Sequence, residues 1–326
     1  MIVLAGDVGG TSTRLGLFSV ENRNVKKLVF EKYPNKKFGR LAEIVKLFLT
    51  TNDAHPRAAA FGIAGPVIEG VCKATNIPWK IDVGPLSREI GISRTTIVND
   101  FVAHAHGLDA LHSKDIAVVQ RGKYENLSNK ALFGPGTGLG EAIVAQHGGD
   151  AVVLPSEGGH QDFAPQDELQ MALFCYLKAK FGHVSNERIL SGAGLVNVYE
   201  FIKNMRYAKE SSAVRKLLDA KGASKPAIIM KQASKDKLCK KTTDLFFSVL
   251  GAEAGNLALQ AMAFGGVYII GGLVRNNIAL LKKSPFLKSF REKGRMSHLM
   301  SRFPIYVVKN ELLGIIGAAS LASELV

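Results

Sequence analysis

The sequence predicts an α/β protein, and three observations lead to that prediction. Short apolar runs rich in β-branched residues alternate with longer stretches of helical spacing along the 326 residues. Each half of the chain begins with two strand-like runs joined by a turn rich in glycine and threonine. Hydrophobic residues make up 47% of the chain and glycines number 33, which is typical of an α/β enzyme and not of a disordered or fibrous protein.

The order of the elements supports this class. Helical candidates separate the strand-like runs, as expected when a sheet is covered by helices. The strand-like runs lie at 2–7, 15–20, 28–34, 58–65, 95–100, 116–120, 130–136, 141–146, 151–155, 266–272 and 304–308. The helical candidates lie at 39–52, 166–182, 193–205, 242–266 and 310–324.

The opening segment has a counterpart in the middle of the chain. Residues 1–20 can be laid over 129–147 so that Gly10 and Thr11 match Gly136 and Thr137. Duplication of one α/β unit, with the two turns facing each other across a cleft, explains this match. The alternative is two unrelated hairpins that share turn chemistry, because glycine is common in turns.

The net charge of +14 raises the question of nucleic-acid binding. The basic residues are scattered, however, and gather only in short clusters such as 293–302. No helix-turn-helix, zinc-finger or RNA-binding aromatic pattern accompanies them. We therefore expect no nucleic-acid partner, and a basic surface that suits an anionic substrate.

The remaining composition predicts a cytoplasmic protein without a membrane partner. Cys72, Cys175 and Cys239 lie far apart and form no metal-binding or disulfide pattern. The apolar stretch at 261–274 is too short and too rich in glycine to span a bilayer. The chain begins directly with a strand-like run, which leaves no room for a signal peptide.

The two glycine-threonine turns are candidate phosphate sites. The stretch GDVGGTSTR (6–14) matches neither the phosphate loop of nucleotide hydrolases nor the dinucleotide fingerprint. Backbone amides and hydroxyls in such turns can still hold phosphoryl oxygens, and Asp7 could hold Mg²⁺ directly or through water.

Asn99 and Asp100 follow a β-branched strand and should lie at its carboxyl end, where α/β sheets bind ligands. A carboxylate there can accept a proton from a substrate hydroxyl. The alternative is that these residues cap the helix that follows, although a cap needs only one of them.

Three further stretches carry candidate ligands. Glu157 and His160 flank a double glycine and suit the hydroxyls of a polyol better than a metal, for which a third ligand is missing. Glu187 is either a ligand or only an acidic residue in the first turn of a helix capped by Ser185 or Asn186. Gly271 and Gly272 end a buried strand, where they allow either a flat ligand such as adenine or a tight strand-to-helix turn.

These stretches occur in an order that resembles one family. DVGGTSTR, NDF, GTGLG, SEGGHQDFAP, NERILSGAGL and YIIGGLV together resemble the bacterial-type, ATP-dependent glucokinases of the hexokinase/actin/Hsp70 superfamily. The resemblance covers nearly the whole chain. It implies two ribonuclease-H-like (actin-like ATPase) domains, a small one at 1–110 plus 304–326 and a large one at 111–303.

The resemblance also implies roles for single residues. Asp100 would be the general base for the sugar 6-hydroxyl, and ATP and Mg²⁺ would be the cofactors of a homodimer. The sugar ligands would be Asn99, Glu157, His160 and Glu187. The phosphate and adenosine sites would comprise Gly6, Asp7, Val8, Gly9, Gly10, Thr11, Gly136, Thr137, Gly138, Gly271 and Gly272.

Some features depart from the family pattern. No cysteine cluster for zinc is present, and LVRNN lacks the proline expected beside Arg275. Glu141 follows the second turn, where its carboxylate would repel phosphate unless it points away or helps to hold Mg²⁺.

The alternatives to glucose phosphorylation are a kinase of the same fold for another hexose or an amino sugar, a sugar-binding regulator without catalysis, and a polymerising actin-like protein.

Overall fold

The computed structural model describes residues 1–21, 24–74 and 77–326. The chain forms two compact units, each described here by itself. The first unit comprises Met1–Asp115, Val153–Pro155 and Asn310–Val326, and the second comprises Ile116–Val152 and Ser156–Lys309. The sequence analysis divided the chain at 110 and 304, whereas these units divide at 115 and 309.

The first unit is built on a five-stranded sheet with the order β3-β2-β1-β4-β8. Its first three strands are antiparallel, and β4 and β8 run parallel to β1. The bounds are β1 Ile2–Val8, β2 Ser12–Glu21, β3 Asn24–Pro34, β4 Ala58–Ile63 and β8 Arg94–Asn99. A separate small sheet contains β5 (Val67–Ile68), β6 (Val71–Lys73) and β7 (Lys80–Asp82).

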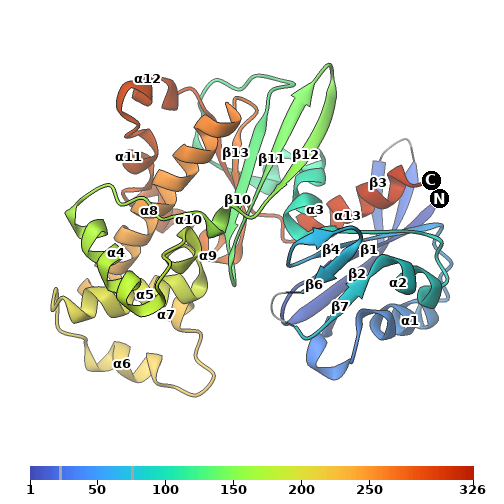
Figure 1. The fold of residues 1–326 in the computed structure, drawn as a ribbon, viewed down its shortest axis with the longest axis horizontal. Coiled ribbons are helices and arrows are strands. Elements are labelled where there is room, and N and C mark those ends of the chain that lie inside the picture. Colours follow the sequence, from blue (N-terminus) through green and yellow to red (C-terminus); the bar gives the residue numbers. More distant parts are fainter. Residues whose placement is uncertain (22–23, 75–76) are drawn as a thin grey trace. The chain divides into compact units, whose positions relative to one another are not determined.

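Helices cover both faces of this sheet. The side chains of β1 alternate between two apolar clusters, because successive residues of a strand point to opposite faces. Leu4 and Val8 pack with α1 (Leu41–Thr51) and α2 (Val83–Ile90). Val3 packs with α3 (Asp100–His106) and α13 (Leu313–Glu324) on the other face. Figure 1 shows these four helices around the blue strands.

A six-stranded sheet with the order β12-β11-β10-β13-β14-β9 lies in the second unit, except for Val153–Pro155 of β12, which belong to the first. The hairpin of β10 and β11 is antiparallel, and β13 and β14 run parallel to β10. The bounds are β9 Ile116–Gln120, β10 Lys130–Pro135, β11 Leu139–His147, β12 Asp150–Ser156, β13 Val267–Ile269 and β14 Ile305–Val308. The two hairpins hold equivalent places in their sheets, each beside a parallel strand, as the duplication hypothesis predicts.

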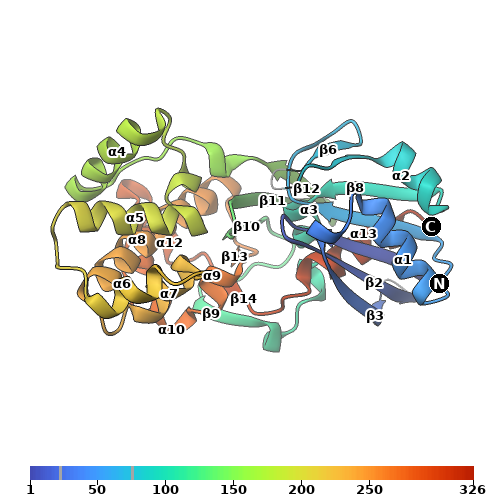
Figure 2. The same ribbon diagram turned by 90° about the horizontal axis from the view of Figure 1, so that it is seen from below.

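The long helix α8 (Lys237–Ala261) organises the apolar core of the second unit. It packs against α5 (Gly192–Asn204), α7 (Lys225–Gln232) and α11 (Phe286–Arg291) (Figures 1 and 2). The other helices are α4 Glu168–Phe181, α6 Ser212–Leu218, α9 Gly272–Arg275, α10 Ile278–Lys282 and α12 Ser297–Met300. Within the described residues, no helix has the length and apolar character needed to cross a bilayer.

The helix expected at 242–266 was misplaced at both ends. α8 begins earlier because the Asp236 side chain accepts a hydrogen bond from the Cys239 amide at 2.9 Å and so caps it. It ends at Ala261 because Met262 takes the left-handed conformation, with φ 47°.

Candidate active site

The turn between β1 and β2 is held in shape by Asn35, which lies in the 3₁₀ helix η1 (Asn35–Lys37) and is 4% exposed. Its Nδ2 donates to the Gly9 carbonyl at 2.7 Å, and its amide donates to the Thr11 carbonyl at 3.0 Å. Its Oδ1 accepts from the Thr13 hydroxyl at 2.8 Å. The sequence analysis missed Asn35, because no local pattern links it to a turn so far away in the chain.

The expected phosphate-binding stretch divides into two parts. Gly9, Gly10 and Thr11 form the turn itself, whereas Gly6 and Val8 lie inside β1. Val8 is fully buried in the core, and a side chain at Gly6 would overlap the ring of Phe61. These two residues could therefore meet a phosphate only through their backbone.

Asp7 and Arg14 face each other across the β1–β2 hairpin. Arg14 Nη1 lies 3.3 Å from Asp7 Oδ2 and donates to the Glu311 carbonyl at 3.3 Å. Arg14, which had no role in the sequence analysis, thus orients the carboxylate of Asp7.

Asn99 and Asp100 stand at the end of β8, where α3 begins. Asn99 caps the helix, since its Oδ1 accepts from the Phe101 amide at 2.8 Å, and its Nδ2 donates to the Gly65 carbonyl at 3.1 Å. Both polar atoms of the Asn99 side chain therefore have roles in the fold. Asp100 is not needed as the cap, although its carboxylate also accepts from the Phe101 amide, at 3.0 Å.

Asp100 has an unusual electrostatic environment. Burial raises its pKa to about 6, against the lowering effect of His104, and the negative charge of Asp7 adds to the rise. A carboxylate with a pKa in this range is still ionised at neutral pH and is a better proton acceptor than an ordinary aspartate. The first unit thus holds a tuned carboxylate near the β1–β2 turn.

In the second unit, the turn between β10 and β11 is bound to the start of α5 and to η5 (Asn186–Arg188). The Gly136 carbonyl accepts from the Gly192 amide at 2.9 Å, and the Leu139 amide donates to Glu187 Oε2 at 2.8 Å. Gly136 and Thr137 are exposed at the tip, and a side chain at Gly138 would overlap Glu187 Oε2.

The two expected sugar-binding stretches lie together. The Asn186 amide donates to the Gln161 carbonyl at 3.0 Å, which joins η5 to the chain that leaves η4 (Gly158–His160). Glu157 and His160 are exposed. Burial raises the pKa of Glu157, His160 lowers it and Glu187 raises it, so these three charges interact.

The expected helix cap near Glu187 is wrong in one respect. The Ser185 side chain caps nothing, and Glu187 belongs to the short η5. The helix α5 begins later, where the Ser191 hydroxyl accepts from the Gly194 amide at 2.9 Å.

Gly271 and Gly272 form a tight strand-to-helix turn. Gly271 has φ 101°, which favours glycine, and it precedes α9 directly. Its Cα also lies close to the Pro135 backbone, where a side chain would come within 2.5 Å of the carbonyl oxygen. The positive φ and the close approach to Pro135 both require glycine at position 271, whether or not a ligand binds beside it.

Glu141 points away from the β10–β11 turn. Its side chain is 1% exposed, and its Oε2 occupies the space where a side chain at Gly158 would begin. Burial raises the pKa of Glu141 to about 8, and the neighbouring Glu253 adds to this rise. The carboxyl group is therefore a neutral acid at neutral pH, behind the turn and not beside a phosphate.

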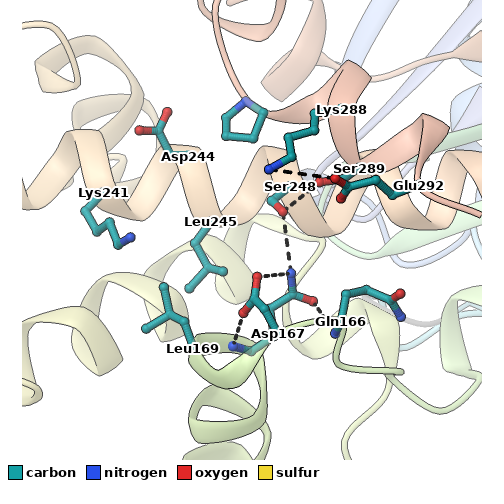
Figure 3. Close-up of a pocket in the computed structure, with 12 residues that line it drawn as sticks. Gln166, Asp167, Leu169, Lys241, Asp244, Leu245, Ser248, Lys288, Ser289 and Glu292 are labelled. Atoms are coloured by element: carbon teal, nitrogen blue, oxygen red, sulfur yellow. Dashed lines mark hydrogen bonds and ion pairs between the residues drawn. The ribbon is translucent and has the colours of Figure 1, made fainter.

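A separate surface cavity of about 300 Å³ lies between α4, α8 and α11 (Figure 3). Its polar groups satisfy one another: Gln170 Nε2 donates to Asp167 Oδ2 at 3.2 Å, and the Ser248 and Ser289 hydroxyls are 2.8 Å apart. None of the residues expected to bind substrate lines this cavity.

Comparison with solved structures defines the class first. A glucokinase from an Antarctic psychrotroph has a TM-score of 0.85 and 29% identity, with 99% of each chain covered. A glucokinase from Streptomyces griseus, solved with glucose and AMPPNP, has a TM-score of 0.67 at 20% identity and covers 99% of this chain and 100% of its own. A transcriptional regulator with a TM-score of 0.72 and 16% identity has the same fold, over 99% of this chain and 78% of its own. The chain thus has the two-domain α/β fold of sugar kinases and their relatives.

Sequence comparison then narrows the class. The sequence profile described as Glucokinase matches residues 4–325. A glucokinase from Nostoc sp. is 36% identical over 340 aligned residues, which cover 99% of each chain. One from Neisseria meningitidis is 36% identical and covers 97% of this chain and 93% of its own. The chain belongs to the glucokinase family.

Proposed function

We propose that this protein transfers the γ-phosphoryl group of ATP to the 6-hydroxyl of glucose, the first step of glycolysis. Asp100 carries the proposal, because it is an ionised carboxylate of raised pKa at the carboxyl end of β8, close to Asp7 and to the β1–β2 turn. Asp100 accepts the hydroxyl proton as O6 bonds to the γ-phosphorus. The bond from that phosphorus to the bridging oxygen breaks, and ADP leaves.

Three of the four sugar ligands are assigned to the second unit. Glu157, His160 and Glu187 offer two carboxylates and an imidazole on two joined turns, and each can hydrogen-bond a sugar hydroxyl. Asn99 of the first unit has its amide oxygen in the α3 cap, which leaves one amide hydrogen for a substrate. The exposed Gly136 and Thr137 suit a phosphate, since the N-terminus of α5 lies beside them.

Magnesium fits the oxygen donors of the first unit. The described residues contain no cluster of three or more His, Cys, Asp or Glu side chains arranged for a metal. Mg²⁺ needs fewer protein ligands, because it keeps several waters and binds substrate phosphates. Asp7, with its half-buried carboxylate held by Arg14, would hold the ion directly or through water. When bound, Mg²⁺ neutralises charge on the phosphates.

We also propose that the first unit is the small domain and the second unit the large domain. The protein is further proposed to be a homodimer located in the cytoplasm. Sedimentation of the purified protein tests the homodimer.

The decisive experiment measures ADP release with Mg-ATP and a panel of glucose, mannose, fructose and amino sugars. We expect glucose to give the highest kcat/KM. A higher kcat/KM for another sugar would assign the protein to a different hexose or amino sugar. Sugar binding in a calorimeter without turnover on any sugar would identify a regulator.

A further inference from the structure

A buried polar cluster lies behind the turns that carry the candidate sugar ligands. Glu141 of β11, Asn186 of η5 and Glu253 of α8 are 1%, 4% and 5% exposed. Lys293, which follows α11, donates from Nζ to the Ala252 carbonyl at 2.8 Å and to Asn256 Oδ1 at 2.6 Å. The reaction proposed above uses none of these side chains, although burying so many polar groups is costly.

Glu253 has the partners that an ionised carboxylate needs. Its Oε2 accepts from Asn256 Nδ2 at 3.0 Å, and the Asn186 side chain also donates to it. Burial raises the pKa of Glu253 overall, and the two hydrogen bonds and the charge of the Lys293 ammonium oppose this rise. Because Asn186 begins η5, Glu253 is connected to the turn that carries Glu187.

Glu141 lacks such partners. Its Oε2 lies against Gly158 at the start of η4, and its buried Oε1 has no hydrogen-bond partner among the described residues. The charge that faces it is the negative charge of Glu253. An ionised carboxylate in this place would be buried, unsolvated and repelled, whereas a neutral acid fits.

The other elements around Glu141 supply no compensating cation. Ser156, at the end of β12, is uncharged, and its hydroxyl accepts a hydrogen bond from the Gly158 amide at 2.9 Å. Glu157 and His160, at the ends of the η4 turn, interact with each other and with Glu187. Lys293 binds the Ala252 carbonyl and Asn256 and interacts with Glu253; burial lowers the pKa of Lys293 and Glu253 opposes this.

We propose that Glu141 is a positioning residue: as a neutral acid it lets the Gly158 turn lie against β11, and loss of its proton displaces this turn and weakens sugar binding at alkaline pH. The inference rests on the proposed function in one respect, namely that Glu157 and His160 at this turn bind the sugar. Glu141 itself touches neither substrate nor the reacting atoms.

The test compares glucose binding by calorimetry at about pH 7 and about pH 9 in three proteins: wild type, Glu141→Gln and Glu168→Gln. Glutamine keeps the shape of the neutral acid and cannot ionise. Glu168 is an exposed glutamate on α4 and serves as the matched control. With a pKa of about 8 for Glu141, only about a tenth of the wild type is competent at pH 9, so Kd rises about tenfold.

We expect the same rise in Glu168→Gln and a nearly constant Kd in Glu141→Gln. In turnover, the wild type should show this change in the KM for glucose and a much smaller one in kcat. A residue with only a structural role would not give a pH-dependent Kd that glutamine abolishes.

A wild-type Kd that stays constant up to pH 9 would overturn the inference, as would an equal rise in Glu141→Gln. The wild-type pH series decides the first point even if Glu141→Gln does not fold. Failure of the proposed function looks different, because the wild type would then not phosphorylate glucose at pH 7, whatever the pH dependence of its Kd. Absence of glucose binding at pH 7 would overturn the sugar-binding part of the inference as well.

Discussion

Replacing Glu141 by glutamine should change how the stability of the second unit depends on pH. The folded protein raises the pKa of Glu141 from 4.5 to about 8, so the folded state binds this proton more tightly than the unfolded state does. The contribution of this bound proton to the free energy of unfolding is fully present below about pH 4.5 and is lost as the pH rises towards 8. The variant has no such proton to lose.

The size of the effect follows from the same values. One pKa unit corresponds to about 1.4 kcal/mol, so the complete loss across this range is about 5 kcal/mol. Between pH 6 and pH 8, the wild type should lose about 2 kcal/mol of unfolding free energy that Glu141→Gln does not lose.

The assay uses denaturant unfolding at several pH values, followed by two signals. Far-ultraviolet circular dichroism reports mainly on long helices, and α4, α5 and α8 all belong to the second unit. Trp79 is the single tryptophan and lies buried in the first unit, so its fluorescence is an internal control. We expect the pH dependence of the dichroism transition to differ between wild type and variant, and that of Trp79 fluorescence to be the same.

An identical pH dependence of the dichroism transition in both proteins would refute the reasoning. It would mean that Glu141 is not held as a neutral acid, either because its carboxylate reaches water or because a donor satisfies it. The exposed variant Glu168→Gln should follow the wild type at every pH and so measures the effect of the substitution chemistry alone.

Four further substitutions, one of them a control, test the proposed site. Asp100→Asn should lower kcat by about 10²–10⁴-fold with little change in glucose affinity, because it removes the proton acceptor and keeps the shape; near-normal turnover in steady-state kinetics would remove Asp100 as the base. Glu157→Gln should weaken glucose binding by about tenfold, the value of one charged hydrogen bond, and an unchanged calorimetric Kd would exclude Glu157 as a sugar ligand. Gly138→Ala should displace Glu187, weaken glucose binding and lower the free energy of unfolding by about 1–2 kcal/mol. The control is Gly136→Ala, whose added Cβ would have its nearest neighbour 4.0 Å away, and it should keep the wild-type Tm and glucose Kd.

The sheets and long helices could be predicted because their patterns extend over many residues. Each strand-like run of the sequence analysis corresponds to one of the strands of the two large sheets, and the helix expected at 193–205 lies at Gly192–Asn204. The small sheet of β5–β7 was missed, since its strands have two or three residues and, unlike the equally short β13, do not lie within a longer apolar stretch. The helices α9–α12 were missed because they too are short.

The site residues could be predicted only where their neighbours in sequence are also their neighbours in space. The cap by Asn99 joins residues two apart, and the turns around Gly9 and Gly136 are local. Asn35 could not be found in this way, because its partners lie more than twenty residues away in the chain. The same holds for Glu253, which reaches η5 and β11 only in the folded unit.

The double glycine at 158–159 shows how a motif can be noticed for one reason and required for another. In the sequence it separates Glu157 from His160, the two candidate ligands for the hydroxyls of a polyol. In the structure, a side chain at Gly158 would overlap Glu141 Oε2, and one at Gly159 would overlap the Leu139 carbonyl. The glycines are thus required by β11, which passes directly beneath the turn.

The buried position of Glu141 had only a partial signal in the sequence. Side chains two apart on a strand share a face, and Leu139, which is 5% exposed, precedes Glu141 by two residues on β11. This parity agrees with a buried Glu141, but Ala142 and Val144 of the opposite parity are buried as well, so parity alone does not place the carboxyl group. In the structure, the double glycine lets the turn approach Glu141 closely, and burial beside Glu253 favours the protonated acid. Gly158 and Glu141 therefore pack directly against each other. A substitution at Glu141 should for this reason change the Kd for glucose.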